Sequence, residues 1–131
     1  MDEIDIEILE VLKRDSRTKY VEIAEMVGLT EGAVRRRVKK MVEQGIIRKF
    51  TIEAKAEVEA VILVKTDPTQ TRNVALRIKD FSEKVFEVSG DYDVAAWIQA
   101  YTIEKLNEKV DQIRNLPSVL ETSTLVKLVS D

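Results

Sequence analysis

The first 45 residues place apolar side chains at the three- and four-residue spacing that predicts α-helices with one buried face. Asp2 is a favourable cap for a first helix that extends to about Arg14. A second helix begins near Lys19 and ends at Gly28, because glycine readily adopts the left-handed conformation found after helices. The core positions predicted on these two helices are Ile4, Ile8, Leu9, Leu12, Tyr20, Ile23, Ala24 and Val27.

A third helix is predicted directly after the short turn Gly28-Leu29. Thr30 is a good N-cap, and Glu31 places a negative charge in the first turn, where the helix dipole favours it. The helix ends at Gly45, and its predicted buried stripe consists of Val34, Val38, Met41 and Val42. Two helices joined by a tight glycine-containing turn form a helix-turn-helix, whose second helix enters the DNA major groove. We therefore expect this third helix to read DNA.

The segment Ile46-Ile47-Arg48-Lys49-Phe50-Thr51-Ile52 alternates apolar and polar side chains. This alternation is typical of a strand with one face on the core, and we interpret it as the wing that follows a helix-turn-helix. Residues 1–52 are thus predicted to be a winged helix-turn-helix DNA-binding domain. Residues 53–57, rich in Glu and Ala, are predicted to be a short linker.

Residues 58–131 are predicted to fold as a second, α+β domain. Four segments have the composition and pattern of strands. The first begins at Val58 and stops before Asp67-Pro68, and the others are Val85 to Ser89, Val94 to Ala100 and Val119 to Val129. Two helices lie between them and carry Val74, Ala75, Ile78, Phe81, Ile103, Leu106, Val110 and Ile113 at helical spacing. The order βαββαβ is the ferredoxin-like arrangement.

Two helices cover only one face of a four-stranded sheet, so the other face is predicted to be bare. That face carries many apolar residues, and exposed apolar surfaces of this size usually contact a partner. We predict a homodimer formed sheet to sheet, which suits a helix-turn-helix that reads two half-sites. Trp97 is interpreted as part of this sheet packing and not as a ligand contact.

The charge is distributed unevenly along a chain whose formal net charge is −3. Residues 1–51 carry 11 basic and 10 acidic side chains, whereas residues 52–131 carry 10 basic and 14 acidic ones. Residues 35–49 carry a local charge of +6, because seven basic side chains face only Glu43. A concentrated basic patch on an acidic protein favours binding to a polyanion such as DNA.

Several kinds of chemistry are excluded by composition. The 131 residues contain no cysteine and no histidine, so disulfides, thiolate chemistry, imidazole bases and the commonest zinc ligands are absent. We expect no catalytic residue, no metal and no cofactor of an enzyme. No segment approaches the roughly 20 apolar residues that cross a membrane, and the acidic start Met1-Asp2-Glu3 is unlike a signal peptide. A cytoplasmic protein is therefore predicted.

The candidate DNA contacts are the capping threonine and the basic side chains of the third helix and the wing: Thr30, Arg35, Arg36, Arg37, Lys39, Lys40, Arg48 and Lys49. The alternative is an ordinary solvated helix face. That alternative leaves like charges four residues apart at Arg35/Lys39 and Arg36/Lys40, which phosphate contacts would offset. Arg35 and Arg36 lie in the half that usually enters the groove, so they are expected to read bases while Lys39 and Lys40 bind phosphates.

Taken in order, these motifs resemble those of the Lrp/AsnC, or feast/famine, transcription regulators over nearly the whole chain. The segments that carry the resemblance are Asp2-Glu3-Ile4-Asp5-Ile6-Glu7-Ile8-Leu9, Val21-Glu22-Ile23-Ala24, Val27-Gly28-Leu29-Thr30, Val34-Arg35-Arg36-Arg37-Val38, Glu43-Gln44-Gly45-Ile46-Ile47, Ser89-Gly90-Asp91-Tyr92-Asp93 and Leu116-Pro117-Ser118-Val119. The resemblance implies dimerisation through the C-terminal sheets, often followed by assembly into larger even-numbered oligomers. It also implies an amino-acid effector bound in the C-terminal domain.

The effector site is expected at Gly90, Asp91, Tyr92 and Asp93, with hydroxyls from Thr122, Ser123 and Thr124 on the strand that the resemblance places nearby. An amino acid presents an ammonium and a carboxylate, for which an aspartate and turn amides are complementary partners. The alternatives are an ordinary hairpin turn and the ordinary preference of threonine for strands.

Two features depart from the family pattern: the linker is shorter than usual, and Glu31-Gly32 stands where proline is common. Two other functions are kept as alternatives to a sequence-specific regulator. One is a DNA-packaging protein of low specificity. The other is an effector-sensing subunit of a metabolic enzyme, because ferredoxin-like domains also serve in that role.

Overall fold

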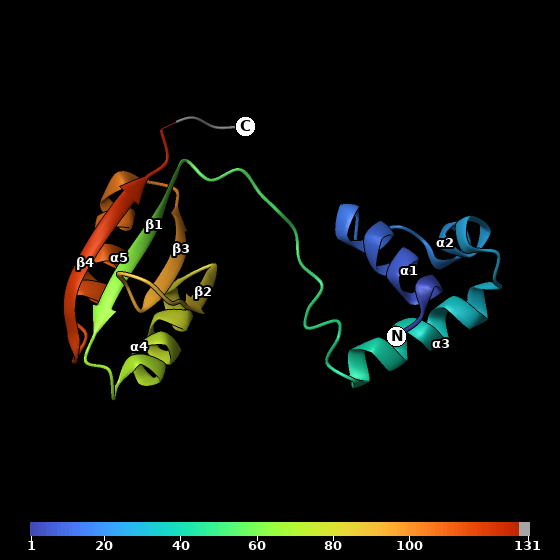
Figure 1. The fold of residues 1–131 in the computed structure, drawn as a ribbon. Helices are drawn as coiled ribbons and strands as arrows, with labels where there is room; N and C mark the ends of the chain where they lie inside the picture. The colour runs from blue at the N-terminus through green and yellow to red at the C-terminus, as the bar shows by residue number, and fades with distance from the viewer. Residues whose placement is uncertain (129–131) are drawn as a thin grey trace. The chain divides into compact units, whose positions relative to one another are not determined.

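The computed structural model describes residues 1–128, and the chain divides into two compact units, Met1–Ala54 and Lys55–Asp131 (Figure 1). The first unit is helical, and the second contains a four-stranded sheet with two helices on one face. No helix among residues 1–128 is long and apolar enough to cross a membrane.

The first unit consists of α1 (Glu3–Arg14), α2 (Tyr20–Val27) and α3 (Glu31–Glu43). Asp2 caps α1 as predicted, because its side chain accepts a hydrogen bond from the Asp5 N–H and the Asp5 carboxylate accepts one from the Asp2 N–H. This reciprocal arrangement is a capping box. The buried side chains that the three helices share are Ile8, Leu12, Ile23, Ala24, Val34, Val38 and Met41.

The turn between α2 and α3 has the predicted geometry. Gly28 adopts the left-handed conformation with φ 74°, which ends α2, and the Thr30 side chain then accepts a hydrogen bond from the Ala33 N–H at 3.2 Å. A side chain other than glycine would be strained at that φ. The helix-turn-helix prediction is confirmed.

The predicted wing strand is wrong, because residues 46–52 form neither a helix nor a strand. A strand needs a neighbouring strand to receive its backbone hydrogen bonds, and the described part of the first unit offers none. Ile47 packs against the helical core, but Phe50 and Ile52 are exposed. The predicted buried stripe of α3 is also wrong at Val42, which is 45% exposed because it lies on the flank of the helix away from Val34.

The second unit has the predicted βαββαβ order, which confirms the ferredoxin-like fold. Its elements are β1 (Val58–Thr66), α4 (Thr71–Ile78) with a 3-10 turn (Lys79–Phe81), β2 (Lys84–Glu87), β3 (Val94–Ala100), α5 (Ile103–Arg114) and β4 (Val119–Val126). All pairings are antiparallel, in the order β2-β3-β1-β4. The last strand ends at Val126, and the predicted end at Val129 lies outside the described residues.

The core of the second unit lies between the sheet and its two helices. Alternate residues of β1 and β3 point to this side, among them Ile62, Val64 and Ile98, and they pack against the apolar side chains of α4 and α5. Because successive side chains in a strand point to opposite faces, the residues between them lie on the other face of the sheet.

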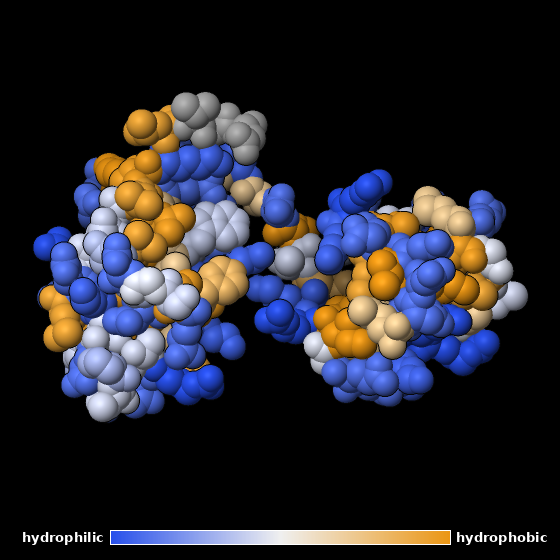
Figure 2. Space-filling view, in the orientation of Figure 1, coloured by the Kyte–Doolittle hydropathy of each residue, from blue (hydrophilic) through white to orange (hydrophobic). Residues whose placement is uncertain are grey.

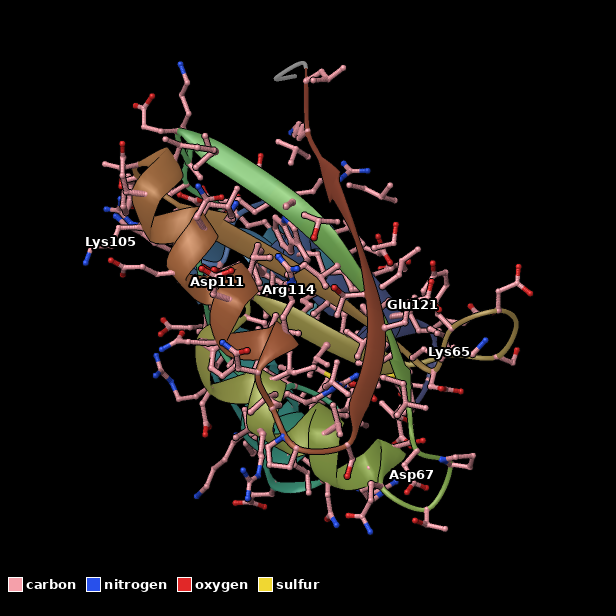
Figure 3. The ribbon with its side chains drawn as sticks, turned by 90° about the vertical axis from the view of Figure 1, so that its left-hand side faces the viewer. Lys65, Asp67, Lys105, Asp111, Arg114 and Glu121 are labelled. Carbon is pink, nitrogen blue, oxygen red and sulfur yellow. The ribbon has the colours of Figure 1, made fainter. Side chains whose placement is uncertain are left out.

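That other face, here called the open face, has an apolar centre. The strand register places Trp97, Val61 and Leu125 in one row, and the adjacent row contains Phe86, Ala95, Leu63 and Ser123. Apolar side chains are visible at the molecular surface over β4 and β1 (Figure 2). Next to them, Lys65 and Glu121 lie side by side on β1 and β4 (Figure 3).

One end of the open face contains a polar cluster around Glu59. Its carboxylate accepts hydrogen bonds from Gln99 Nε2 at 2.8 Å, from Trp97 Nε1 at 3.1 Å and from Lys127 Nζ at 3.1 Å. These donors favour the charged form, so the bonds from Gln99 and then Lys127 hold the pKa of Glu59 below its ordinary value. Trp97 is therefore a member of the sheet face, with its indole N–H satisfied on the same face.

Candidate DNA-binding surface

Helix α3 packs one side against α1 and α2 and turns the other side outward. Val34, Val38 and Met41 are buried, and a helix advances by about 100° per residue. Arg36, Lys39 and Lys40 consequently lie about 140–240° around the helix from Val34, on the outward side. All three are exposed, and none takes part in an ion pair within residues 1–128.

Arg35 is held by contacts within the unit. Its guanidinium forms an ion pair with Glu31, one turn earlier on α3, at 2.6 Å. It also lies 5.2 Å from the centre of the Tyr20 ring on α2, within range of a cation–π contact. Arg35 stays exposed at the flank of the helix and is available to a phosphate only in competition with Glu31.

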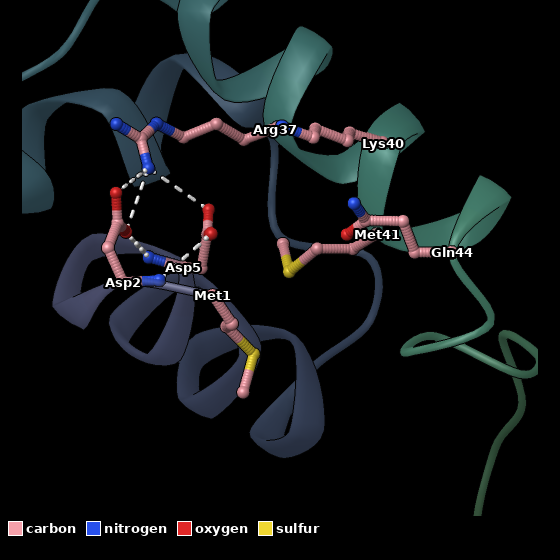
Figure 4. A pocket seen from close by; sticks show the side chains of 7 residues that line it. All are labelled: Met1, Asp2, Asp5, Arg37, Lys40, Met41 and Gln44. Atoms are coloured by element: carbon pink, nitrogen blue, oxygen red, sulfur yellow. Dashed lines mark hydrogen bonds and ion pairs between the residues drawn. The ribbon is translucent and has the colours of Figure 1, made fainter.

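Arg37 makes a different set of contacts, with the start of α1. Its Nη1 lies 2.7 Å from Asp2 Oδ2, 2.8 Å from Asp2 Oδ1 and 3.1 Å from Asp5 Oδ1 (Figure 4). The bond from Arg37 lowers the pKa of Asp2, and Asp2 and Asp5 together raise the pKa of Arg37. A hollow of about 490 Å³ adjoins this cluster and is lined by Met1, Asp2, Asp5, Arg37, Lys40, Met41 and Gln44.

The expectation that Glu43 is the only acidic partner of the basic patch is therefore wrong for two arginines. Glu31, Asp2 and Asp5 all precede residues 35–49 in sequence, and folding brings them to the patch. What remains is a smaller cationic surface on the outward side of α3, formed by Arg36, Lys39 and Lys40. Arg48 and Lys49, predicted on the wing, are exposed in the irregular segment that follows α3.

Gly32 lies on the outward side of α3, near Arg36. A side chain there would meet only the end of Arg36, whose Nη1 would lie 3.5 Å from the added Cβ. The absence of a side chain at this position leaves the backbone of the first helical turn open to an approaching surface. The sequence shows Gly32 only as a departure from proline, and no local signal predicts this placement.

The predicted effector residues are divided between different parts of the second unit. Gly90 and Asp91 form the exposed tip of the loop between β2 and β3, where Gly90 has φ 118°. Asp93 is turned inward: its Oδ2 accepts a hydrogen bond from the Thr66 N–H at 2.8 Å, while its own N–H donates to Val64 O. Asp93 thus continues the pairing at the end of β1, and its carboxylate already has a partner. Tyr92 is half-buried between them.

The hydroxyl residues of β4 do not share a face. Thr122 and Thr124 pair with Val64 and Ile62 on the helix-covered side, whereas Ser123 pairs with Leu63 on the open face. A small hollow of about 240 Å³ lies at the edge of the sheet, lined by Arg114, Val119, Leu120, Glu121 and Thr122. Arg114 at the end of α5 and Glu121 on β4 are both visible there (Figure 3).

A small three-helix unit with a cationic helix at its surface, followed by a separate ferredoxin-like unit, defines a helix-turn-helix DNA-binding protein with a second domain. Residues 1–48 match the family described as winged helix-turn-helix DNA-binding, and residues 59–129 match the Lrp/AsnC ligand binding domain. The chain belongs to the Lrp/AsnC family of transcription regulators.

Similar proteins share both units. The HTH-type transcriptional regulator LysM of Sulfurisphaera tokodaii is 37% identical over 98% of this chain and 95% of its own length. Among solved structures, PH0061 has a TM-score of 0.89 at 22% identity, covering 100% of this chain and 95% of that one. A transcriptional regulator from Neisseria meningitidis, solved as its L-Met complex, has a TM-score of 0.79 at 22% identity, covering 98% and 90%. The solved structures show the fold of this chain. Its membership of the family identifies it as a transcription regulator and not as an enzyme.

Proposed function

We propose that this regulator binds specific sites on double-stranded DNA as a homodimer and that an amino acid modulates its assembly or DNA affinity. The observation that carries the DNA-reading part is the outward surface of α3. Arg36, Lys39 and Lys40 project from the second helix of a helix-turn-helix without an acidic partner in residues 1–128. Three unneutralised cations on one helix face repel one another in the free protein, and DNA phosphates relieve that repulsion.

Arg36→Gln is expected to weaken DNA binding about tenfold or more and to reduce its salt dependence. The measurement is binding to a duplex selected by the wild type from a random pool, repeated over a range of salt concentrations. Arg36 is proposed to neutralise a phosphate in addition to reaching the base edges, and each lost phosphate contact lowers the slope of log K against log salt by about 0.9. Arg77→Gln on α4 makes the same charge change on an exposed arginine of the other unit and serves as the control. Equal effects of the two variants would contradict the assignment.

The same assay separates a specific regulator from a DNA-packaging protein. A regulator prefers its own site over random-sequence duplex by about 10³ or more, because base contacts add to the phosphate contacts. A packaging protein would bind both duplexes with the same affinity, and that affinity would vary with salt concentration but not with DNA sequence.

The open face of the sheet supports the homodimer. Its centre is apolar, and Val61, Leu125 and Phe86 are each more than a third exposed in the single chain. Association of two identical faces would remove these side chains from water, which stabilises a complex by about 25 cal/mol for each Å² buried. A twofold axis through the face also supplies two copies of α3, one for each half-site.

The effector proposal is supported by the ligand-binding family of the second unit and by the L-Met bound to the structurally similar Neisseria protein. Within the predicted site, the carboxylate of Asp93 already accepts a hydrogen bond from Thr66. The Asp91 side chain is exposed and forms no ion pair with a basic residue among residues 1–128, so it is the carboxylate proposed for the ammonium of an amino acid. Gly90 presents its turn amides to solvent at the same loop tip. On β4, Ser123 lies on the open face of the sheet, whereas Thr122 and Thr124 lie on the helix-covered face. A single bound amino acid could therefore contact Ser123 or the two threonines, but not all three.

At least one of the twenty amino acids is expected to bind the full-length protein in calorimetric titration, and Asp91→Ala is expected to lose most of that binding. The carboxylate–ammonium bond is charge-assisted and therefore among the stronger polar contacts. Asp80→Ala removes an exposed acid elsewhere in the same unit and is the matched control. If the wild type binds none of the twenty, the protein has no amino-acid effector.

A further inference from the structure

The sequence predicts Arg37 as a DNA contact, but in the structure its side chain is bonded to the start of α1. A single nitrogen of its guanidinium lies within 3.1 Å of three carboxylate oxygens, two from Asp2 and one from Asp5. The Arg37 side chain is 31% exposed and that of Asp5 is 17% exposed, compared with 63% for Arg35. Arg37 is therefore the more enclosed of the two ion-paired arginines of α3.

The two carboxylates that hold Arg37 are themselves fixed by the start of α1. Asp2 accepts the Asp5 N–H at 2.9 Å, and Asp5 accepts the Asp2 N–H at 3.3 Å. They also lie at the N-terminus of α1, where the helix dipole stabilises negative charge. The acceptors of Arg37 thus have a defined position before Arg37 binds them. An ion pair between preorganised groups loses less side-chain entropy than one between two mobile surface residues.

The charge balance of this cluster opposes a phosphate contact. Two carboxylates surround one guanidinium, so the group formed by Asp2, Asp5 and Arg37 has a net charge of −1. A DNA phosphate that approached the other N–H groups of Arg37, on Nη2 and Nε, would be repelled by both carboxylates. Arg36, the preceding residue, forms no ion pair with an acidic side chain of residues 1–128 and lies on the outward side of α3.

We propose that Arg37 is a positioning residue that makes no contact with DNA and fixes the DNA-reading helix α3 against the capped N-terminus of α1. Arg37 lies two turns after the N-cap Thr30, and its bonds to Asp2 and Asp5 therefore fix the rotation of α3 about the helix axis. A small rotation would move Arg36 and Lys39 sideways in the groove. Asp2 and Asp5 therefore contribute to DNA affinity although they are acidic. This inference rests on the proposed reading role of α3.

The test compares binding of the full-length variants to the duplex that the wild type selects from a random pool, over a range of salt concentrations. Arg37→Gln is expected to weaken binding by between about 3- and 100-fold, the range expected for coupled residues, with the salt slope unchanged. Arg36→Gln is expected to lower the slope. Arg37→Lys keeps the charge and one bond, and it is expected to recover part of the lost affinity.

Asp5→Asn gives the sharper result, because the two roles of Arg37 predict opposite signs. Removal of an acid near a DNA-binding surface should strengthen binding to a polyanion if Arg37 contacts phosphate. The positioning role predicts weaker binding instead, and Arg37→Gln with Asp5→Asn together should lose little more than either alone. Glu3→Gln removes an acid from the same turn of α1 with no bond to Arg37 and is the matched control. Melting curves of each variant identify the temperature at which all remain folded.

A reduced salt slope for Arg37→Gln, or tighter binding by Asp5→Asn, would overturn the positioning role while leaving α3 as the reader. If neither Arg36→Gln nor Arg37→Gln changes binding, α3 does not read DNA, and both proposals fail. The pattern that supports both is a lower slope for Arg36→Gln alone, with weaker binding for Arg37→Gln and for Asp5→Asn.

Discussion

Val61→Glu is expected to convert the proposed sheet-to-sheet dimer into a folded monomer. Val61 lies at the centre of the open face, in the row that it shares with Trp97 and Leu125, and it is 37% exposed in the single chain. In the monomer a glutamate there keeps its charge in water. In a sheet-to-sheet dimer the twofold axis would bury two such carboxylates without partners, which costs several kcal/mol for each. Because about 1.4 kcal/mol changes an equilibrium constant tenfold, we expect dissociation to increase by about 10³-fold or more.

Sedimentation at a series of protein concentrations measures this change directly. Leu76→Glu is the matched control, since Leu76 is an exposed leucine on α4, on the helix-covered side of the same unit. DNA binding should weaken together with dimerisation, because a monomer contacts one half-site only. A Val61→Glu protein that sediments as a dimer would show that the open face is not the interface.

Ile8→Ala is expected to unfold the first unit and leave the second one folded. Ile8 is completely buried in the helical core, and truncation of such a side chain to alanine costs about 2–5 kcal/mol. A helical unit of this size seldom has more than about 3–5 kcal/mol of stability to lose. The core of the second unit consists of other residues, so its stability does not depend on this side chain.

Circular dichroism and calorimetric melting distinguish the two units, because one transition should disappear or move to a much lower temperature while the other stays. DNA binding should be lost with the first transition. Ile6→Ala makes the same chemical change on the same helix at a position that is 46% exposed, and it should shift stability by no more than about 0.5 kcal/mol. A single transition that moves as a whole in Ile8→Ala would show that the two units unfold together.

Those parts of the fold that depend on local chemistry were predictable from the sequence. The glycine at the left-handed position after α2, the threonine cap of α3 and the aspartate cap of α1 each act within four residues of their own position. Periodicity also located the strands β1 and β3, because buried and exposed side chains alternate along them. For these elements, spacing alone is sufficient evidence.

Features that depend on a distant partner could not be predicted in the same way. Residues 46–52 have the alternation of a strand, but alternation does not reveal whether a neighbouring strand exists. Arg37 is bonded to carboxylates that are 35 and 32 positions away in sequence. A count of charge over neighbouring residues therefore cannot reveal these ion pairs. The inward turn of Asp93 toward Thr66 likewise follows from the register of β1 and β3.

The irregular segment from Gln44 to Glu57 joins the two units and exposes Arg48, Lys49 and Lys55 (Figure 1). A trypsin-like protease that cut there would release a fragment with an intact open face and no reading helix. If the protein forms the proposed dimer, such fragments would exchange with intact chains, and each mixed dimer would keep a single copy of α3. Cleavage of a minority of chains would then silence a larger share of the dimers, so the severed C-terminal unit would act as a dominant-negative inhibitor of its own protein.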